Sequence, residues 1–192
     1  MKKTSRILVL IISLVLISAY FLPVWEIELE APQYPEGLGM NIWINKITGD
    51  LNTINGLNHY IGMKTIQPDS IKELTLMPYI LGFIIILGIA VAFIGKKKLL
   101  LVWVLIFMSL GIAGGVDFYL WEYDYGHNLN PEAAIKIPGM SYQPPLIGTK
   151  QLANFTAVSL PDTGGYILIG AGVAALLLLF YDRRNKQEFT VK

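Results

Sequence analysis

The 192-residue sequence contains no cysteine, and only 15% of its residues are charged. The lack of cysteine excludes disulfide bonds, zinc sites built on thiolates and catalysis by a thiol. So little charge would leave the surface of a soluble domain uncovered, and 54% of the residues are hydrophobic. The composition therefore predicts an integral membrane protein, and the length allows one membrane domain with modest loops.

Enzyme signatures are also missing from the sequence. It has no glycine-rich phosphate loop, no His-Glu-x-x-His motif and no nucleophile elbow. No charged residue lies in the middle of a hydrophobic run, which argues against a transporter or a proton pump. The net charge of +1 gives no reason to expect a nucleic acid partner. We therefore expect a protein that is not an enzyme.

Four hydrophobic runs approach the roughly 20 residues that a transmembrane helix needs. They cover residues 7–22, 77–94, 99–116 and 164–181. Because backbone groups in lipid need partners within their own segment, we predict helices rather than strands. The first run has the positive start of a signal peptide, but no good small-x-small cleavage site follows it, so we predict a retained anchor.

The charged residues divide unevenly between the two sides of these runs. Ten of the fifteen basic residues lie before the first run, between the second and third, or after the fourth. Twelve of the fourteen acidic residues lie in the two remaining loops. The positive-inside rule therefore places both termini in the cytoplasm and both acidic loops outside.

These predictions divide the chain into five parts. They are a transmembrane anchor (1–24), a first outer loop (25–76), a transmembrane helical hairpin (77–121), a second outer loop (122–163), and a transmembrane helix with a cytoplasmic tail (164–192). Glycines in the third and fourth runs predict close contact between those helices or with a partner. The predicted fold class is a membrane α-helical protein with four transmembrane helices and a small ordered exterior domain made by the two outer loops.

The outer loops have patterns of their own. In the first, Trp25, Ile27 and Leu29 alternate with glutamates, and alternation resumes at 41–45 after a turn expected at 37–40. This period of two predicts a β-hairpin. In the second loop, residues 130–145 are rich in proline and glycine but poor in flexible polar residues, which predicts an ordered, irregular loop packed on the first.

Three acidic residues, Asp117, Glu122 and Asp124, stand where the third run leaves the membrane. Acidic groups near the bilayer can mark ion or proton paths. Tyrosines and a tryptophan flank them here, and such residues favour the lipid headgroup level. The sequence therefore favours a hydrated interface as the surroundings of all three.

Soft metal ligands gather in the two outer loops. They are His59, Met63, Met40, His127 and Met140. The first two are four residues apart and would share a face of a helical turn. Thioether and imidazole groups suit Cu(I), and acidic loops would attract a cation. The alternative is that the methionines pack and the histidines only hydrogen-bond, so Cu(I) is a candidate cofactor.

Four loop strings resemble those of a small family of bacterial multi-span membrane proteins. The strings are APQYPEGLGM from Ala31, LNHYIGMK from Leu57, WEYDYGHNL from Trp121 and PGMSYQPPLIGTKQ from Pro138. Members of this NosB-like family are encoded beside the copper chaperone NosL in some nitrous oxide reductase gene clusters. The resemblance implies a denitrification accessory protein of the inner membrane, serving assembly, copper supply or electron supply of the periplasmic reductase. It carries over no catalytic residues.

The leading hypothesis is an accessory protein whose exterior domain contacts a periplasmic or membrane partner. A structural subunit of a larger membrane complex, with no ligand of its own, fits the ordered loops and glycine-rich runs equally well. A third alternative is a membrane enzyme or quinone-reactive protein that uses His59 or His127 and the aromatic cluster, with no specific motif behind it.

Overall fold

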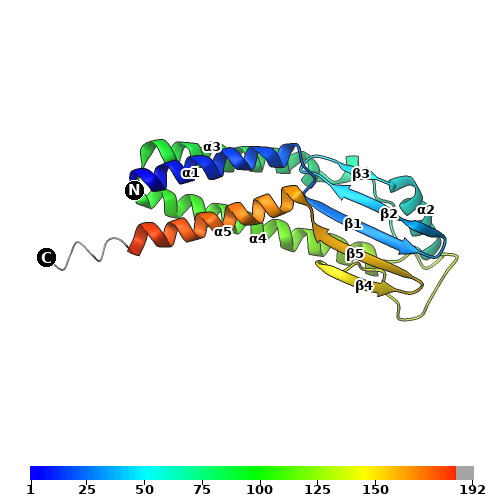
Figure 1. The fold of residues 1–192 in the computed structure, drawn as a ribbon. Coiled ribbons are helices and arrows are strands. Elements are labelled where there is room, and N and C mark those ends of the chain that lie inside the picture. The colour runs from blue at the N-terminus through cyan, green and yellow to red at the C-terminus, as the bar shows by residue number, and fades with distance from the viewer. Residues whose placement is uncertain (185–192) are drawn as a thin grey trace.

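The computed structural model describes residues 1–184, which form a bundle of long helices with a β-sheet at one end (Figure 1). The bundle contains α1 (Lys3–Val15) with its 3₁₀ continuation η1 (Leu16–Tyr20), α3 (Lys72–Ile94), α4 (Lys97–His127) and α5 (Thr163–Arg184). By length and composition, α1 with η1 and each of the other three could cross a membrane. The four predicted helices are therefore confirmed as candidate membrane spans.

The sheet has five antiparallel strands in the order β3-β2-β1-β5-β4. They are β1 (Trp25–Ala31), β2 (Tyr34–Ile42), β3 (Ile47–Gly49), β4 (Gly148–Leu152) and β5 (Phe155–Pro161). The first two form the predicted hairpin. Its turn lies at 32–33, so the turn expected at 37–40 is wrong, because those residues continue β2 and pair with β1.

The pairing of β1 with β5 joins the two loops into one unit. It runs from Trp25 opposite Pro161 to Glu30 opposite Thr156. The prediction that the loops pack together is confirmed, and residues 130–145 are irregular as predicted. Residues 148–161 lie outside that prediction and form β4 and β5. Pairing with a strand more than a hundred residues earlier makes this stretch regular, and no local pattern reveals such a partner.

One face of the sheet carries the core of this unit. Ile27, Leu38 and Met40 are buried together on that face. The next residue after Ile27 on β1, Glu28, points to the other face and is exposed. Helix α2 (Leu51–Ile61) contributes the buried Ile54 to the same cluster. We call the five strands, α2 and the segments that connect them the sheet domain.

The opposite end of the bundle is tied by polar contacts between helix ends. Arg6 of α1 donates to the carbonyl oxygen of Ala92 at 2.8 Å. The buried carboxylate of Asp182 accepts a hydrogen bond from Ser5 Oγ at 3.0 Å and lies 3.3 Å from Lys97 Nζ. The N-terminus and the end of α5 therefore lie at the same end of the bundle, far from the sheet (Figure 1). The predicted tail beyond residue 184 lies outside the described residues.

Helix α4 is longer than a bilayer requires. Its 31 residues span about 46 Å at 1.5 Å per residue, whereas the hydrocarbon core is about 30 Å thick. The excess extends past the predicted membrane run 99–116 and packs alongside the sheet domain (Figure 1). This extension, residues 117–127, brings polar and aromatic side chains of α4 to the sheet.

Candidate functional site

The sheet domain encloses a cavity of about 280 Å³. One wall is the apolar face of the sheet, and the others are α2, the extension of α4 and the segment 135–144. Ile27, Met40, Ile54 and Trp121 are among the apolar and aromatic side chains that line it. A mostly apolar cavity with few polar groups is the usual form of a small-molecule site, although this volume is at the small end of such sites.

The spacing of residues on α4 turns one face of the extension toward the cavity. Phe118, Trp121, Glu122 and Tyr125 recur at three- and four-residue intervals, which places them on one side of a helix. The rings of Trp121 and Tyr125 have centroids 4.3 Å apart, and Phe118 stacks on Trp121 at 6.3 Å. The aromatic stripe packs against the sheet core and carries a single carboxyl group with it.

That carboxyl group is buried without a partner. Glu122 is 1% exposed and lines the cavity, and neither of its oxygens has a hydrogen-bond partner among the described residues. Burial raises the pKa of Glu122 to about 8, because the charged form loses its hydration there. Glu122 lies beyond the predicted membrane run 99–116, and its side chain is buried against the cavity. At neutral pH it is mostly protonated and can donate a hydrogen bond.

A second unpartnered group comes from the loop before β4. The hydroxyl of Tyr142 is buried, lines the same cavity and also lacks a hydrogen-bond partner among residues 1–184. The Tyr142 N–H donates to the carbonyl oxygen of Gly126 at 2.9 Å. A Cβ at Gly126 would lie 2.3 Å from the backbone nitrogen of Gln143. The glycine thus lets the loop approach α4 one turn beyond Glu122.

The prediction of a hydrated interface for all three acidic residues is wrong for Glu122. Asp117 is exposed, and the Asp124 side chain is 41% exposed and pairs with Lys64, so both agree with the prediction. The contact with Lys64 and a hydrogen bond from Asn128 hold the pKa of Asp124 below its ordinary value. The helical spacing of Glu122 with Trp121 and Tyr125 was the signal that could have separated it from its neighbours.

The five predicted metal ligands are distributed over several parts of the sheet domain. Met40 and Met63 line the cavity. His59 is exposed on α2, with its ring edge against Tyr60, and is not a lining residue. His127 is exposed on α4, where its Nδ1 lies 3.0 Å from the carbonyl oxygen of Tyr123 and its ring stacks on that of Tyr123.

His59 and Met63 do not share a helical turn, contrary to the expectation from their spacing. Helix α2 ends at Ile61, and Gly62 follows in the left-handed conformation with φ +82°. Met63 is therefore beyond the helix, while Met140 lies in the proline-rich segment before Tyr142. Within residues 1–184 no three His, Asp or Glu side chains converge as a metal-binding group. Copper binding by the predicted set stays a prediction.

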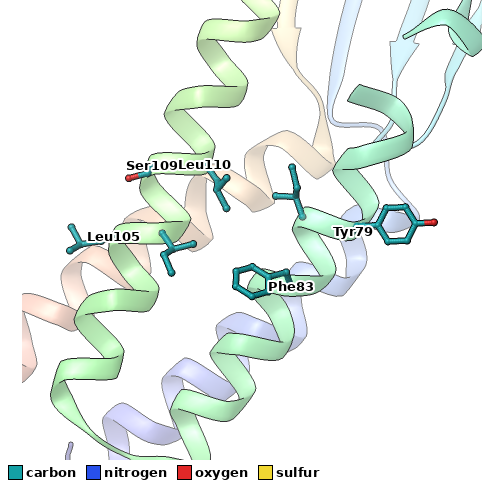
Figure 2. Close-up of a pocket in the computed structure, with 7 residues that line it drawn as sticks. Tyr79, Phe83, Leu105, Ser109 and Leu110 are labelled. Atoms are coloured by element: carbon teal, nitrogen blue, oxygen red, sulfur yellow. The ribbon is translucent and has the colours of Figure 1, made fainter. Parts of the chain in front are cut away.

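A separate groove lies between α3 and α4 in the bundle (Figure 2). Phe83 of α3 and Leu110 of α4 point into it, whereas Tyr79 directs its hydroxyl away. The lining is apolar except for the Tyr79 and Ser109 hydroxyls. A groove of this composition, on helices that could cross a membrane, suits contact with lipid chains or with another helix.

No family model, no curated protein and no solved structure matches this chain.

Proposed function

We propose that this chain is a non-enzymatic accessory protein of a bacterial inner membrane. Its sheet domain stands on the outer side and binds a protein partner in the periplasm or membrane. The division of basic and acidic residues supports this orientation. The loop strings that resemble the NosB-like family support nitrous oxide reductase, or a protein of its assembly, as the partner.

The observation that carries this proposal is the direct junction between bundle and sheet. β5 ends at Pro161 and α5 begins at Thr163, so a single residue separates them. The backbone N–H of Gly164 donates to the carbonyl oxygen of Pro23 at 2.8 Å, and that of Asp162 donates to Val24 at 3.1 Å. Such a junction fixes the sheet domain relative to the helical bundle, which supports its use as a rigid docking platform.

The sheet domain also exposes apolar side chains that a partner could cover. Ile137 is 43% exposed and Ile147 is 62% exposed, and both lie in the segment between α4 and β4. Scattered exposed apolar residues are ordinary, but these two belong to one proline-rich segment with few charges. We assign the partner contact to this segment.

The test uses a nitrous-oxide-reducing bacterium that encodes this chain. Deletion of the gene should lower the copper content and activity of the reductase, and the wild-type gene should restore both. Ile137→Lys with Ile147→Lys should fail to restore them and should lose co-purification with the reductase. Thr149→Lys, at an exposed polar position nearby, is the matched control and should behave as wild type. Full complementation by the double variant would refute the docking segment, and normal reductase in the deletion strain would refute the role.

The structural-subunit alternative has one observation of its own. Gly111 and Gly115 of α4 are four residues apart, and a Cβ at either would meet no heavy atom within 4 Å. Small residues at this spacing allow close approach of a second helix. If this alternative holds, Gly111→Leu with Gly115→Leu should dissociate a native membrane complex in blue native electrophoresis, and the Ile137 and Ile147 substitutions should leave that complex intact.

A further inference from the structure

The buried side chains of Glu122 and Tyr142, which have no hydrogen-bond partner among the described residues, line the same cavity. Nearly all buried polar groups in folded proteins have a hydrogen-bond partner, so each exception needs an explanation. Here the Glu122 carboxyl, 1% exposed, and the Tyr142 hydroxyl, on a residue that is 3% exposed, both line the cavity and both lack a partner among the described residues. Two such exceptions in a single cavity point to a ligand that both groups contact.

The charges around the cavity define the kind of head group that fits. Its lining residues include no lysine, arginine or histidine within the described part of the chain. Besides Glu122, the titratable residues that line it are the tyrosines Tyr34, Tyr60, Tyr125 and Tyr142. An anionic ligand would therefore find no countercharge. Because burial raises the pKa of Glu122 to about 8, the carboxyl is mostly neutral at pH 7 and donates rather than only accepts.

The apolar side chains that line the rest of the cavity indicate what the rest of the ligand is like. Ile27, Leu57, Trp121 and Phe155 present apolar or aromatic surface to the cavity. The volume of about 280 Å³ is at the small end of small-molecule sites, so it suits one or two rings or a short chain and not a whole phospholipid. The cavity also adjoins the part of α4 that leaves the predicted membrane run, close to where molecules from a bilayer would arrive.

We propose that this cavity binds a small, uncharged, largely apolar molecule through a carbonyl-type acceptor, to which Glu122 and Tyr142 donate hydrogen bonds. A quinone ring and a protonated fatty acid both carry this chemistry. The proposal concerns a ligand of the sheet domain itself and holds whether or not the domain docks a protein partner.

The experiment is a calorimetric titration of the purified full chain in detergent at pH 7. The probes are 1,4-naphthoquinone and methyl nonanoate, an uncharged stand-in for a protonated fatty acid, because the acid itself is ionised at pH 7. Naphthalene serves as the matched control without an acceptor. We expect at least one of the first two to bind tenfold more tightly than naphthalene. Preference for the quinone or for the ester identifies the source of the head group. If neither probe binds more tightly than naphthalene, the proposal is overturned.

Substitutions then assign the binding to the two donors. Glu122→Leu removes the donor and should weaken binding at least tenfold, while Glu122→Gln keeps an N–H donor and should retain most of the affinity. Tyr142→Phe should weaken binding severalfold, and Tyr79→Phe, on α3 outside the cavity, should not change it. Replacement of an unpartnered buried polar group by an apolar one is near neutral for folding. Should Glu122→Leu nevertheless misfold, Tyr142→Phe decides alone, and unchanged binding in that variant overturns the proposal.

Discussion

Glu122 shows how the surroundings of a single residue decide its chemistry. It follows Trp121 and precedes Asp124 by two residues, yet it is 1% exposed while the Asp124 side chain is 41% exposed. The helix turns Glu122 toward the sheet and Asp124 toward Lys64 and solvent. Composition and hydropathy cannot show which of these two carboxyl groups is buried. Only their positions in the helical period distinguish them.

The buried carboxyl predicts a pH dependence of stability. In the folded state the Glu122 pKa is about 8, above the ordinary value of 4.5, so the folded protein keeps a proton that the unfolded chain releases between these values. The contribution of Glu122 to the free energy of unfolding is therefore complete below pH 4.5 and is lost as pH rises through 8. The loss is about 1.4 kcal/mol per pH unit within this window.

Thermal unfolding of the detergent-solubilised protein between pH 5 and 8 measures this effect. We expect Glu122→Gln to become more stable relative to wild type as pH rises across the window. Glu132→Gln, at an exposed position in the segment before β4, should follow the wild-type profile. A wild-type profile parallel to that of Glu122→Gln would show that the carboxyl titrates normally in the folded state.

Copper binding is a second prediction for single residues. We expect the purified chain to bind Cu(I) in competition with a chelator, because Met40 and Met63 line one cavity and thioethers favour Cu(I) over Zn(II). Met63→Leu and Met40→Leu, which keep the volume but remove the sulfur, should each weaken binding tenfold, about 1.4 kcal/mol. Met108→Leu in the bundle is the matched control. Equal Cu(I) affinity in all three variants would show that copper binds outside this cavity. Absence of Cu(I) binding by the wild-type chain would refute the prediction.

At the scale of elements, hydropathy and alternation predicted what local sequence determines. The four long helices follow from runs of apolar residues, and the β1–β2 hairpin follows from alternation. Helix α2 has no such local signal, because it contains three asparagines and a glycine, all poor helix formers. Tertiary contacts stabilise it instead: Ile54 is buried in the sheet core, and the Asn55 side chain bonds both backbone groups of Ile66.

The cavity could not be predicted either, because it too depends on tertiary contacts and not on local sequence. Its walls come from both loops and from α4, and they meet only because β5 pairs with β1 and because Gly126 admits the loop at Gln143. Each wall segment taken alone is an ordinary apolar stretch. Candidate metal ligands were chosen by residue type, and residue type does not reveal that Met63 faces the cavity while His59 faces out.

Contact between helices predicts the effect of a glycine substitution in the bundle. A Cβ at Gly88 of α3 would lie 2.2 Å from Ser13 Oγ of α1 and 2.9 Å from the ring of Trp103 of α4. Trp103 is fully buried, so the ring has no free space to move into. Gly88→Ala should therefore lower the free energy of unfolding by about 1–3 kcal/mol. Denaturant titration followed by circular dichroism measures this, with Gly170→Ala, which meets no atom within 4 Å, as the neutral control.

At the scale of the whole molecule, the division of basic and acidic residues matches the two ends of the structure. The α3–α4 connection, the N-terminus and the end of α5 lie at one end of the bundle, and the sheet domain occupies the other (Figure 1). The first end carries Lys2, Lys3, Arg6 and the three lysines of 96–98, while residues 23–76 and 117–163, which lead to and form the sheet end, carry twelve of the fourteen acidic residues. A single orientation in the membrane therefore satisfies the positive-inside rule for every predicted span.

This orientation can be tested with single cysteines, because the natural chain has none. Asn52→Cys on α2 and Glu132→Cys before β4 are at exposed positions of the sheet domain, and Lys98→Cys is exposed at the α3–α4 connection. Lys98 is preferred to Lys97, whose pairing with Asp182 would be lost. A membrane-impermeant maleimide applied to spheroplasts should label the first two positions and not the third. Lysis should make the third position as reactive as the others, which controls for access to the thiol. The opposite result would be labelling of Lys98→Cys from outside, with the sheet-domain positions reactive only after lysis. It would show that the orientation is reversed and that the sheet domain, with its cavity and its docking segment, lies in the cytoplasm.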